Sequence, residues 1–159
     1  MSHFSTVKSI NIVDVTAFIK AMDELGMTKV SRGTEVRPWA SQDKPIKTDV
    51  FCSADGRYGV GLVKNNRGGY DMVSDWSLTG CSLPAKVKAL MPHSSQFPGE
   101  DQEVAKEGHG VARAACNEFR GLASQLTTKY TIVSKYKRLG FMANVSTDAK
   151  GNLTVKLSR

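Results

Sequence analysis

The chain has 159 residues, of which 40% are hydrophobic and 23% are charged, and 22 Lys or Arg against 15 Asp or Glu give a formal net charge of +7. This composition is typical of a soluble globular protein. No uninterrupted apolar stretch approaches the roughly 20 residues that span a bilayer, and the polar Ser2, His3 and Ser5 leave no apolar signal core. We therefore expect a cytoplasmic protein without a membrane partner.

Cysteine and histidine positions argue against a disulfide framework and against a zinc site. Neither residue type shows the close spacing of metal ligands: the six positions are Cys52, Cys81, Cys116, His3, His93 and His109. We accordingly expect no metal and no cofactor.

The N-terminal third predicts a strand, a helix and an irregular connection. Residues 3–10 alternate as in a short strand, and Asp14 can cap the helix that follows. Gly26 stands where a helix stop belongs. Residues 27–47 contain a glycine and two prolines and predict a strand followed by an irregular loop.

Three strands in close order are predicted next. In the first, Val50, Cys52 and Ala54 recur at every second position, and Asp55-Gly56 predicts a hairpin turn. The remaining pattern predicts a strand over 58–62, a turn over 65–69 and a strand over 70–76.

Residues 77–110 form a predicted elaboration of one domain that covers 1–159. Pro84 suits the first turn of a short helix that reaches Met91, where Pro92 ends it. Residues 93–110 contain a proline, glycines and four acids and predict a loosely packed loop.

A long helix over 111–139 and a β-hairpin complete the predicted fold. The helix has an apolar stripe, Gly140 ends it, and residues 141–147 and 153–158 form the hairpin. The expected stripe is Ala115, Phe119, Leu122, Leu126, Tyr130, Val133 and Tyr136. The fold class is α+β: a mostly antiparallel sheet with one N-terminal helix and one long C-terminal helix packed on a face, and a C-terminal β-hairpin.

Several short motifs occur in a fixed order along residues 3–76 and 124–159. The first part contains Val7-Lys-Ser-Ile10, Leu25-Gly26, Thr48-Asp49-Val50, Tyr58-Gly-Val-Gly-Leu62, Tyr70-Asp-Met-Val73 and Asp75-Trp76; the second contains Gln125, Tyr130, Lys137 and Gly140-Phe141. This order resembles an uncharacterised family of cyanobacteria, algal plastids and bacteriophages, labelled hypothetical chloroplast open reading frame thirty-five. The chain departs from the family at Pro38-Trp39, where a glycine-containing turn is common.

The resemblance implies a fold and no established activity. Members of the family are often encoded beside an AAA+ ATPase, so the resemblance implies an accessory or adaptor role with a protein partner of that kind.

The positive charge is concentrated in two segments. Residues 120–159 contain eight Lys or Arg and the single acid Asp148, and residues 29–67 contain eight bases against four acids. Such asymmetry suggests an anionic partner, nucleic acid or an acidic protein face. An ordinary solvated basic surface is an equally good interpretation.

Two sets of residues are candidates for binding. The loop 29–47 places bases around an aromatic side chain, and the acidic-aromatic pair follows the third strand: the partner-binding candidates are Arg37, Trp39, Lys44, Lys47, Asp75 and Trp76. One polar face of the long helix contains the polyanion-binding candidates Arg113, Arg120, Lys135 and Arg138. Bases beside aromatics suit single-stranded nucleic acid, whereas the plainer interpretation is an exposed helix face and a tryptophan folded onto the core.

No motif identifies a reaction. The sequence lacks the phosphate-loop, GxGxxG, GxSxG and HExxH patterns. Asp71 and Asp75 would share one face of the third strand, where a metal-dependent or hydrolytic site with histidines is conceivable but a solvated strand face is the better account. We expect no catalytic residue.

The predicted function is that of a non-catalytic binding or adaptor protein in a larger assembly. The first alternative is direct nucleic-acid binding through the basic helix face and the loop around Trp39. The second is a minor enzyme with an Asp/His site.

Overall fold

The computed structural model describes residues 5–36, 44–97, 113–148 and 152–159. Five strands form one antiparallel sheet in the order β1-β7-β6-β5-β2. Their bounds are β1 Ser5–Ile12, β2 Lys29–Arg32, β5 Val50–Ser53, β6 Gly59–Lys64 and β7 Tyr70–Ser74. Two short ribbons complete the strands: β3 Glu35–Val36 with β4 Ile46–Lys47, and β8 Met142–Thr147 with β9 Leu153–Ser158.

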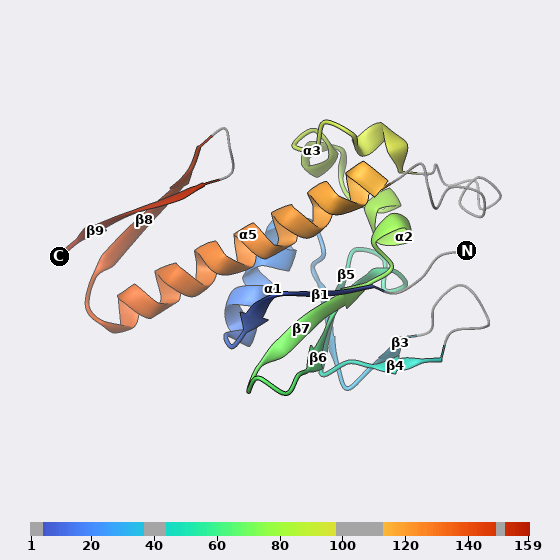
Figure 1. Cartoon of the computed structure of the whole chain (residues 1–159), viewed down its shortest axis with the longest axis horizontal. Coiled ribbons are helices and arrows are strands. Elements are labelled where there is room, and N and C mark those ends of the chain that lie inside the picture. Colours follow the sequence, from blue (N-terminus) through green and yellow to red (C-terminus); the bar gives the residue numbers. More distant parts are fainter. Residues whose placement is uncertain (1–4, 37–43, 98–112, 149–151) are drawn as a thin grey trace.

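The helices are α1 Val15–Glu24, α2 Trp76–Cys81, α3 Ala85–Lys88 and α5 Arg113–Arg138, with one 3-10 turn, η1, at Ser94–Gln96. Figure 1 shows α5 crossing the body of the molecule diagonally, with α1 beside it and the hairpin β8-β9 at its far end. This arrangement confirms the predicted α+β class. None of the helices in the described ranges is both long and apolar enough to cross a bilayer.

Helix α1 forms where the local signals predict it. The Asp14 carboxylate accepts a hydrogen bond from the Ala17 backbone N–H at 3.0 Å, as an N-cap should. Ala17, Phe18, Ala21 and Met22 are buried on one face of the helix. Gly26 ends it with a φ of 84°, a conformation in which a side chain would be strained.

The two predicted turns of the sheet are also present. Asp55 accepts hydrogen bonds from the backbone N–H groups of Arg57 and Tyr58, which closes the β5-β6 hairpin. Asn65 does the same for Arg67 and Gly69 between β6 and β7.

Strand β5 differs from its expected alternation, because all four of its residues are buried and Ala54 lies outside it. A strand with neighbours on both sides can bury both faces when other elements cover them. The irregular loop after β2 includes the short β3-β4 ribbon, which the sequence pattern did not predict.

The core lies between the sheet, α1 and the N-terminal half of α5. It includes Phe18 and Met22 from α1, Leu62 and Met72 from the sheet and Phe119 from α5. The buried residues of α5 are Ala115, Phe119, Ala123 and Thr127. The predicted stripe is therefore correct at its start, while Leu122, Leu126 and Tyr130 pack against the core only partly buried. The buried positions of α5 include Ala123 and Thr127, two small side chains that the expected stripe omitted.

Residues after β7 contain a helix that the sequence analysis missed. The predicted third strand extends to residue 76, but β7 ends at Ser74 and Trp76 begins α2. The predicted short helix after Pro84 is present as α3. Glu118 of α5 accepts from the His93 backbone N–H at 3.0 Å, so α5 also holds the segment next to η1. Most of the predicted 93–110 loop lies outside the described residues.

Alanine at Gly80 and at Gly121, two glycines inside helices, should change stability in opposite directions. A Cβ at Gly80 would overlap the ring of buried Phe97, so Gly80→Ala should lower the free energy of unfolding by about 1–3 kcal/mol. A Cβ at Gly121 meets no heavy atom within 4 Å, so Gly121→Ala should raise it by up to about 1 kcal/mol. Urea unfolding followed by circular dichroism measures both; stabilisation by Gly80→Ala would contradict the packing of α2 on Phe97.

Candidate functional site

Asp75 and Trp76 lie in the interior of the molecule. Asp75 is 4% exposed and caps α2, and its Oδ1 accepts a hydrogen bond from the Leu78 backbone N–H at 3.1 Å. Trp76 is 2% exposed. Asp71 and Asp75 therefore do not share the face of one strand, which corrects that prediction. Asp75 acts as a helix cap, and neither side chain offers a surface to a partner.

Trp76 instead joins α2 to α5. Its ring packs edge-on against Phe119, with centroids 5.1 Å apart and an interplanar angle of 78°. The guanidinium carbon of Arg120 lies 5.7 Å from the centre of the Trp76 ring. A cation over an indole face is attracted by the ring quadrupole. Arg120, a polyanion-binding candidate, is thus partly engaged in holding the helix pair.

The loop candidates are only partly described. Arg37 and Trp39 lie outside the described residues. Lys44 precedes β4 and Lys47 belongs to it, and both are exposed. Both lysines are therefore accessible to solvent. The aromatic residue of this candidate site, Trp39, is not among the described residues.

The polar face of α5 is interrupted between its two ends. Arg113 is exposed at the start, and Lys135 and Arg138 are exposed at the end. Between Arg120 and Lys135 the face contains Ser124, Thr128 and Thr131, and the two threonine hydroxyls donate to the helix's own carbonyls, at 2.9 and 2.8 Å. At about 1.5 Å per residue this gap between bases is about 22 Å long.

The C-terminal part of the chain forms a projecting arm. We define the C-terminal arm as residues 129–148 and 152–159, which comprise the last ten residues of α5 and the hairpin β8-β9; Figure 1 shows it extending beyond the sheet. The hairpin packs on α5 through β8. Phe141 anchors it, with the Tyr136 ring edge-on at 6.4 Å and the Arg159 guanidinium carbon 4.7 Å from its ring centre.

The arm exposes large apolar side chains. Leu139 is 62%, Met142 75% and Leu157 45% exposed. The strand register pairs Ala143 with Leu157 and Val145 with Val155, so one face of the hairpin is apolar. A two-stranded sheet is at best marginally stable alone in water. The apolar side chains of this face are half-buried apart from Leu157, and Met142 lies on the opposite face, so each face of the hairpin exposes one large apolar side chain.

The arm is also strongly basic. Its described acid is Asp148, which holds the turn by accepting from the Asn152 backbone N–H at 2.8 Å. Its described bases are Lys129, Lys135, Lys137, Arg138, Lys156 and Arg159. Exposed apolar groups and positive charge thus occur on the same element.

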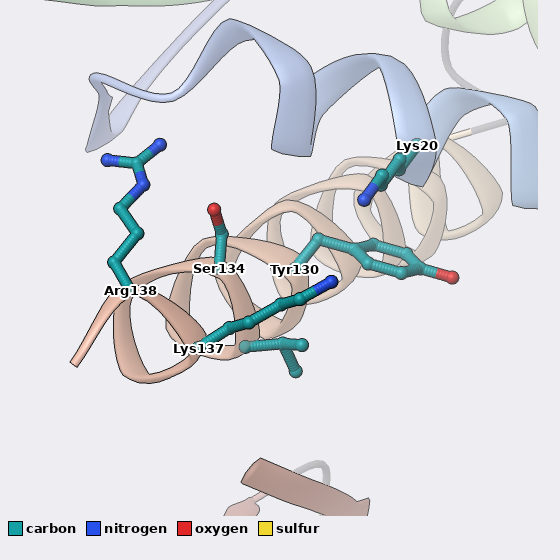
Figure 2. A pocket seen from close by; sticks show the side chains of 6 residues that line it. Lys20, Tyr130, Ser134, Lys137 and Arg138 are labelled. Carbon is teal, nitrogen blue, oxygen red and sulfur yellow. The ribbon is translucent and has the colours of Figure 1, made fainter. Parts of the chain in front are cut away.

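An open groove of about 480 Å³ lies where the arm meets α1. Figure 2 shows Lys20 of α1 and Lys137 of α5 extending toward one another beside the Tyr130 ring, with Arg138 farther along the same helix. Val133 and Ser134 complete the lining. Two helices distant in sequence therefore supply three cations to one concave surface.

The antiparallel helices α1 and α5 contact each other at both ends of their paired region. At one end Arg138 lies 3.7 Å from the Asp14 carboxylate. At the other, the Tyr130 hydroxyl donates to Glu24, and this hydrogen bond together with burial raises the pKa of Tyr130 to about 12. Tyr130 is therefore neutral at physiological pH. Lys20 and Lys137 make no ion pair within the described part of the chain.

The carboxylates and histidines considered for catalysis do not converge. Asp71 accepts from Arg67 at 2.7 Å and from Asn65 at 3.0 Å, at the end of β7 away from Asp75. His93 pairs with Glu118 at 2.5 Å. His3 and His109 lie outside the described residues. Across the described ranges, no group of three or more His, Cys, Asp or Glu side chains is placed to hold a metal ion.

The thiols are poorly suited to nucleophilic chemistry. Burial raises the pKa of Cys52 to about 12. Burial also raises the pKa of Cys81 to about 11, and the nearby Asp75 charge adds to this effect while Lys88 opposes it. The pKa of Cys116 is raised by burial as well. A thiol with a raised pKa is protonated at neutral pH, and the thiolate is the reactive form.

Comparison of the chain with protein-family profiles, with curated proteins and with solved structures finds no match. The family resemblance of the sequence stays a prediction.

The groove contains residues that the sequence analysis did not select. Arg138 was a candidate, whereas Lys20, Ser134 and Lys137 were not. The helical periodicity places Lys20 on the solvent side of α1, which is the one signal available in the sequence. It does not reveal which element lies opposite.

Native thiols should react slowly with iodoacetamide. Because the pKa of Cys81 rises from 9.0 to about 11, its thiolate fraction at pH 8 should be about a hundredfold lower than in the unfolded chain. Alkylation followed by peptide mass spectrometry, in buffer and in urea, measures the ratio for each cysteine. A cysteine that reacts equally fast in both states would contradict the burial described for it.

Proposed function

We propose that this protein is a non-catalytic binding module that docks through its C-terminal arm onto a protein partner with an acidic surface. The observation that carries the proposal is the combination of exposed Leu139, Met142 and Leu157 with the excess of bases on one projecting element. Protein interfaces combine an apolar centre with a polar rim, which this combination matches.

Apolar exposure distinguishes a protein partner from a polyanion. Met142 shares a face of the hairpin with Lys156, since Asn144 pairs with Lys156 in the register. Burial of apolar surface contributes roughly 25 cal/mol per Å² to an association, whereas phosphate contacts need only cations. A partner that covers the hairpin would also stabilise a two-stranded sheet that is marginal by itself.

Charge argues against a second copy of this chain as the occupant. Two arms brought together would juxtapose the bases of both, and like charges facing each other across an interface cost free energy. An acidic partner reverses the sign of that interaction and speeds encounter.

Replacing the exposed apolar residues with serine should abolish partner capture. Leu139→Ser and Met142→Ser should each reduce recovery of the dominant protein partner about tenfold or more, because apolar contact at the interface centre is lost. Affinity purification of the tagged protein from its native cells, with nuclease treatment and quantitative mass spectrometry, measures the recovery.

Leu90→Ser is the matched control for Leu139→Ser. Leu90 is 66% exposed and lies after α3, away from the arm, so its replacement should leave recovery unchanged. Equal recovery with Leu139→Ser and with Leu90→Ser would overturn the assignment of the arm.

Nucleic-acid binding is the second candidate, favoured by the bases concentrated on the arm. The polar face of α5 gives it less support, because its bases are separated by the gap between Arg120 and Lys135 and Arg120 is engaged with Trp76. Arg138 also shares its charge with Asp14. A continuous row of phosphates would meet cations only at the two ends of the helix.

Binding to single-stranded DNA should therefore be weak and easily screened. We expect fluorescence anisotropy with a labelled oligonucleotide to show affinity at low salt that is largely lost at about 0.15 M salt. Tight binding at that salt concentration, removed by Arg120→Glu with Lys135→Glu, would put nucleic acid in place of a protein partner.

A further inference from the structure

We propose that the groove between α1 and α5, lined by Lys20, Lys137 and Arg138, binds an acidic peptide segment of the partner. This inference rests on the proposed function, since Lys137 and Arg138 belong to the arm. In the proposed contact, carboxylates of the peptide bind between cations that come from two helices.

The first argument is the convergence of like charges. Lys20 and Lys137 extend toward one another from facing helices (Figure 2), and neither is paired within the described residues. Two ammonium groups facing each other repel, so a carboxylate between them gains from both. The Ser134 hydroxyl adds a hydrogen-bond donor to the same surface.

The second argument is that the helix dipole explains the position of only two of the three cations. Lys137 and Arg138 occupy the last turn of α5, where cations compensate the negative end of a helix. Lys20 lies in the middle of the ten-residue helix α1, outside its last turn. The dipole therefore accounts for two of the three cations, and Lys20 is the one that turns the helix end into a concave site.

The third argument favours an acidic peptide over other anions. The lining includes Val133 and the Tyr130 ring, which suit the aliphatic parts of a peptide. The Tyr130 hydroxyl is committed to Glu24, so the ring, and not its polar end, is offered to a ligand. Leu139, which is 62% exposed, follows Arg138 in the chain.

The test uses the full chain and a fluorescein-labelled peptide that alternates glutamate and leucine, followed by fluorescence anisotropy at about 0.15 M salt. The combined variant Lys20→Glu with Lys137→Glu should weaken binding by about tenfold or more, because it places carboxylates where the peptide's carboxylates bind. Lys20→Arg with Lys137→Arg should retain it.

The matched control reverses two exposed lysines elsewhere. Lys29→Glu with Lys86→Glu changes the net charge by the same amount and should weaken binding less than about threefold. Both charge-reversed proteins must first give the same urea unfolding midpoint as the parent. Equal weakening by the two pairs would show attraction by net charge alone and would overturn the groove.

Three further ligands test whether the groove prefers an acidic peptide to other anions. A peptide with glutamine in place of glutamate should bind about tenfold more weakly or worse. Inorganic phosphate should not displace the labelled peptide, and at low salt a single-stranded oligonucleotide should lose no more affinity with the groove variant than with the Lys29→Glu, Lys86→Glu control. Displacement by phosphate, or an oligonucleotide that loses clearly more affinity with the groove variant than with the control, would assign the groove to phosphate and overturn the peptide.

This result is separable from failure of the proposed function. Loss of peptide binding in the groove variant, together with unchanged partner capture in Leu139→Ser, would sustain the groove and overturn the exposed apolar residues of the arm as the docking surface. Partner capture that depends on Leu139, together with a groove variant that binds the peptide normally, would overturn the groove alone.

Discussion

The packing of α5 on the core determines the rest of this structure. A helix of 26 residues is about 39 Å long, whereas a five-stranded sheet is about 20 Å wide and strands of up to eight residues are about 27 Å long. The helix must therefore extend beyond the sheet whichever way it crosses. Its buried residues end at Thr127, and beyond that residue α1 lies beside the helix across an open groove. The arm is the part of α5 that the core cannot cover, together with the hairpin attached to it.

Local signals predicted the elements but not their assembly. Asp14, Gly26, Asp55 and Asn65 act through bonds to neighbours a few residues away, and such signals are present in any window of sequence. Helix α2 escaped prediction because it has six residues, too few to show a helical period. The alternating pattern of the predicted third strand continues through Trp76, so the predicted strand extends to that residue. The Asp75 cap favours the helix locally, and the burial of Trp76 against Phe119, a contact between distant segments, adds to it.

The groove could not be predicted from the sequence for a different reason. Lys20 and Lys137 each look like ordinary solvent-facing lysines of an amphipathic helix. Their proximity depends on the antiparallel pairing of α1 and α5, which share the core and also contact each other through Asp14 and Arg138 and through Glu24 and Tyr130. No local pattern encodes such pairing. The number of bases in the C-terminal segment can be counted from the sequence. Which of them compensate the dipole of α5, and which line a concave surface, is known only from the fold.

Charge alone is a weak reason to assign a function to the arm. The last turn of α5 would contain bases in a protein with no partner, because Lys135, Lys137 and Arg138 compensate the helix dipole. Surface ion pairs such as that of Arg138 with Asp14 contribute little to stability. What the dipole leaves unexplained is Lys20 on the facing helix and the large aliphatic side chains beside the bases. An apolar group held in water costs free energy that burial against a partner recovers. The coincidence of these two features on one overhanging element is the physical reason to regard it as a binding surface.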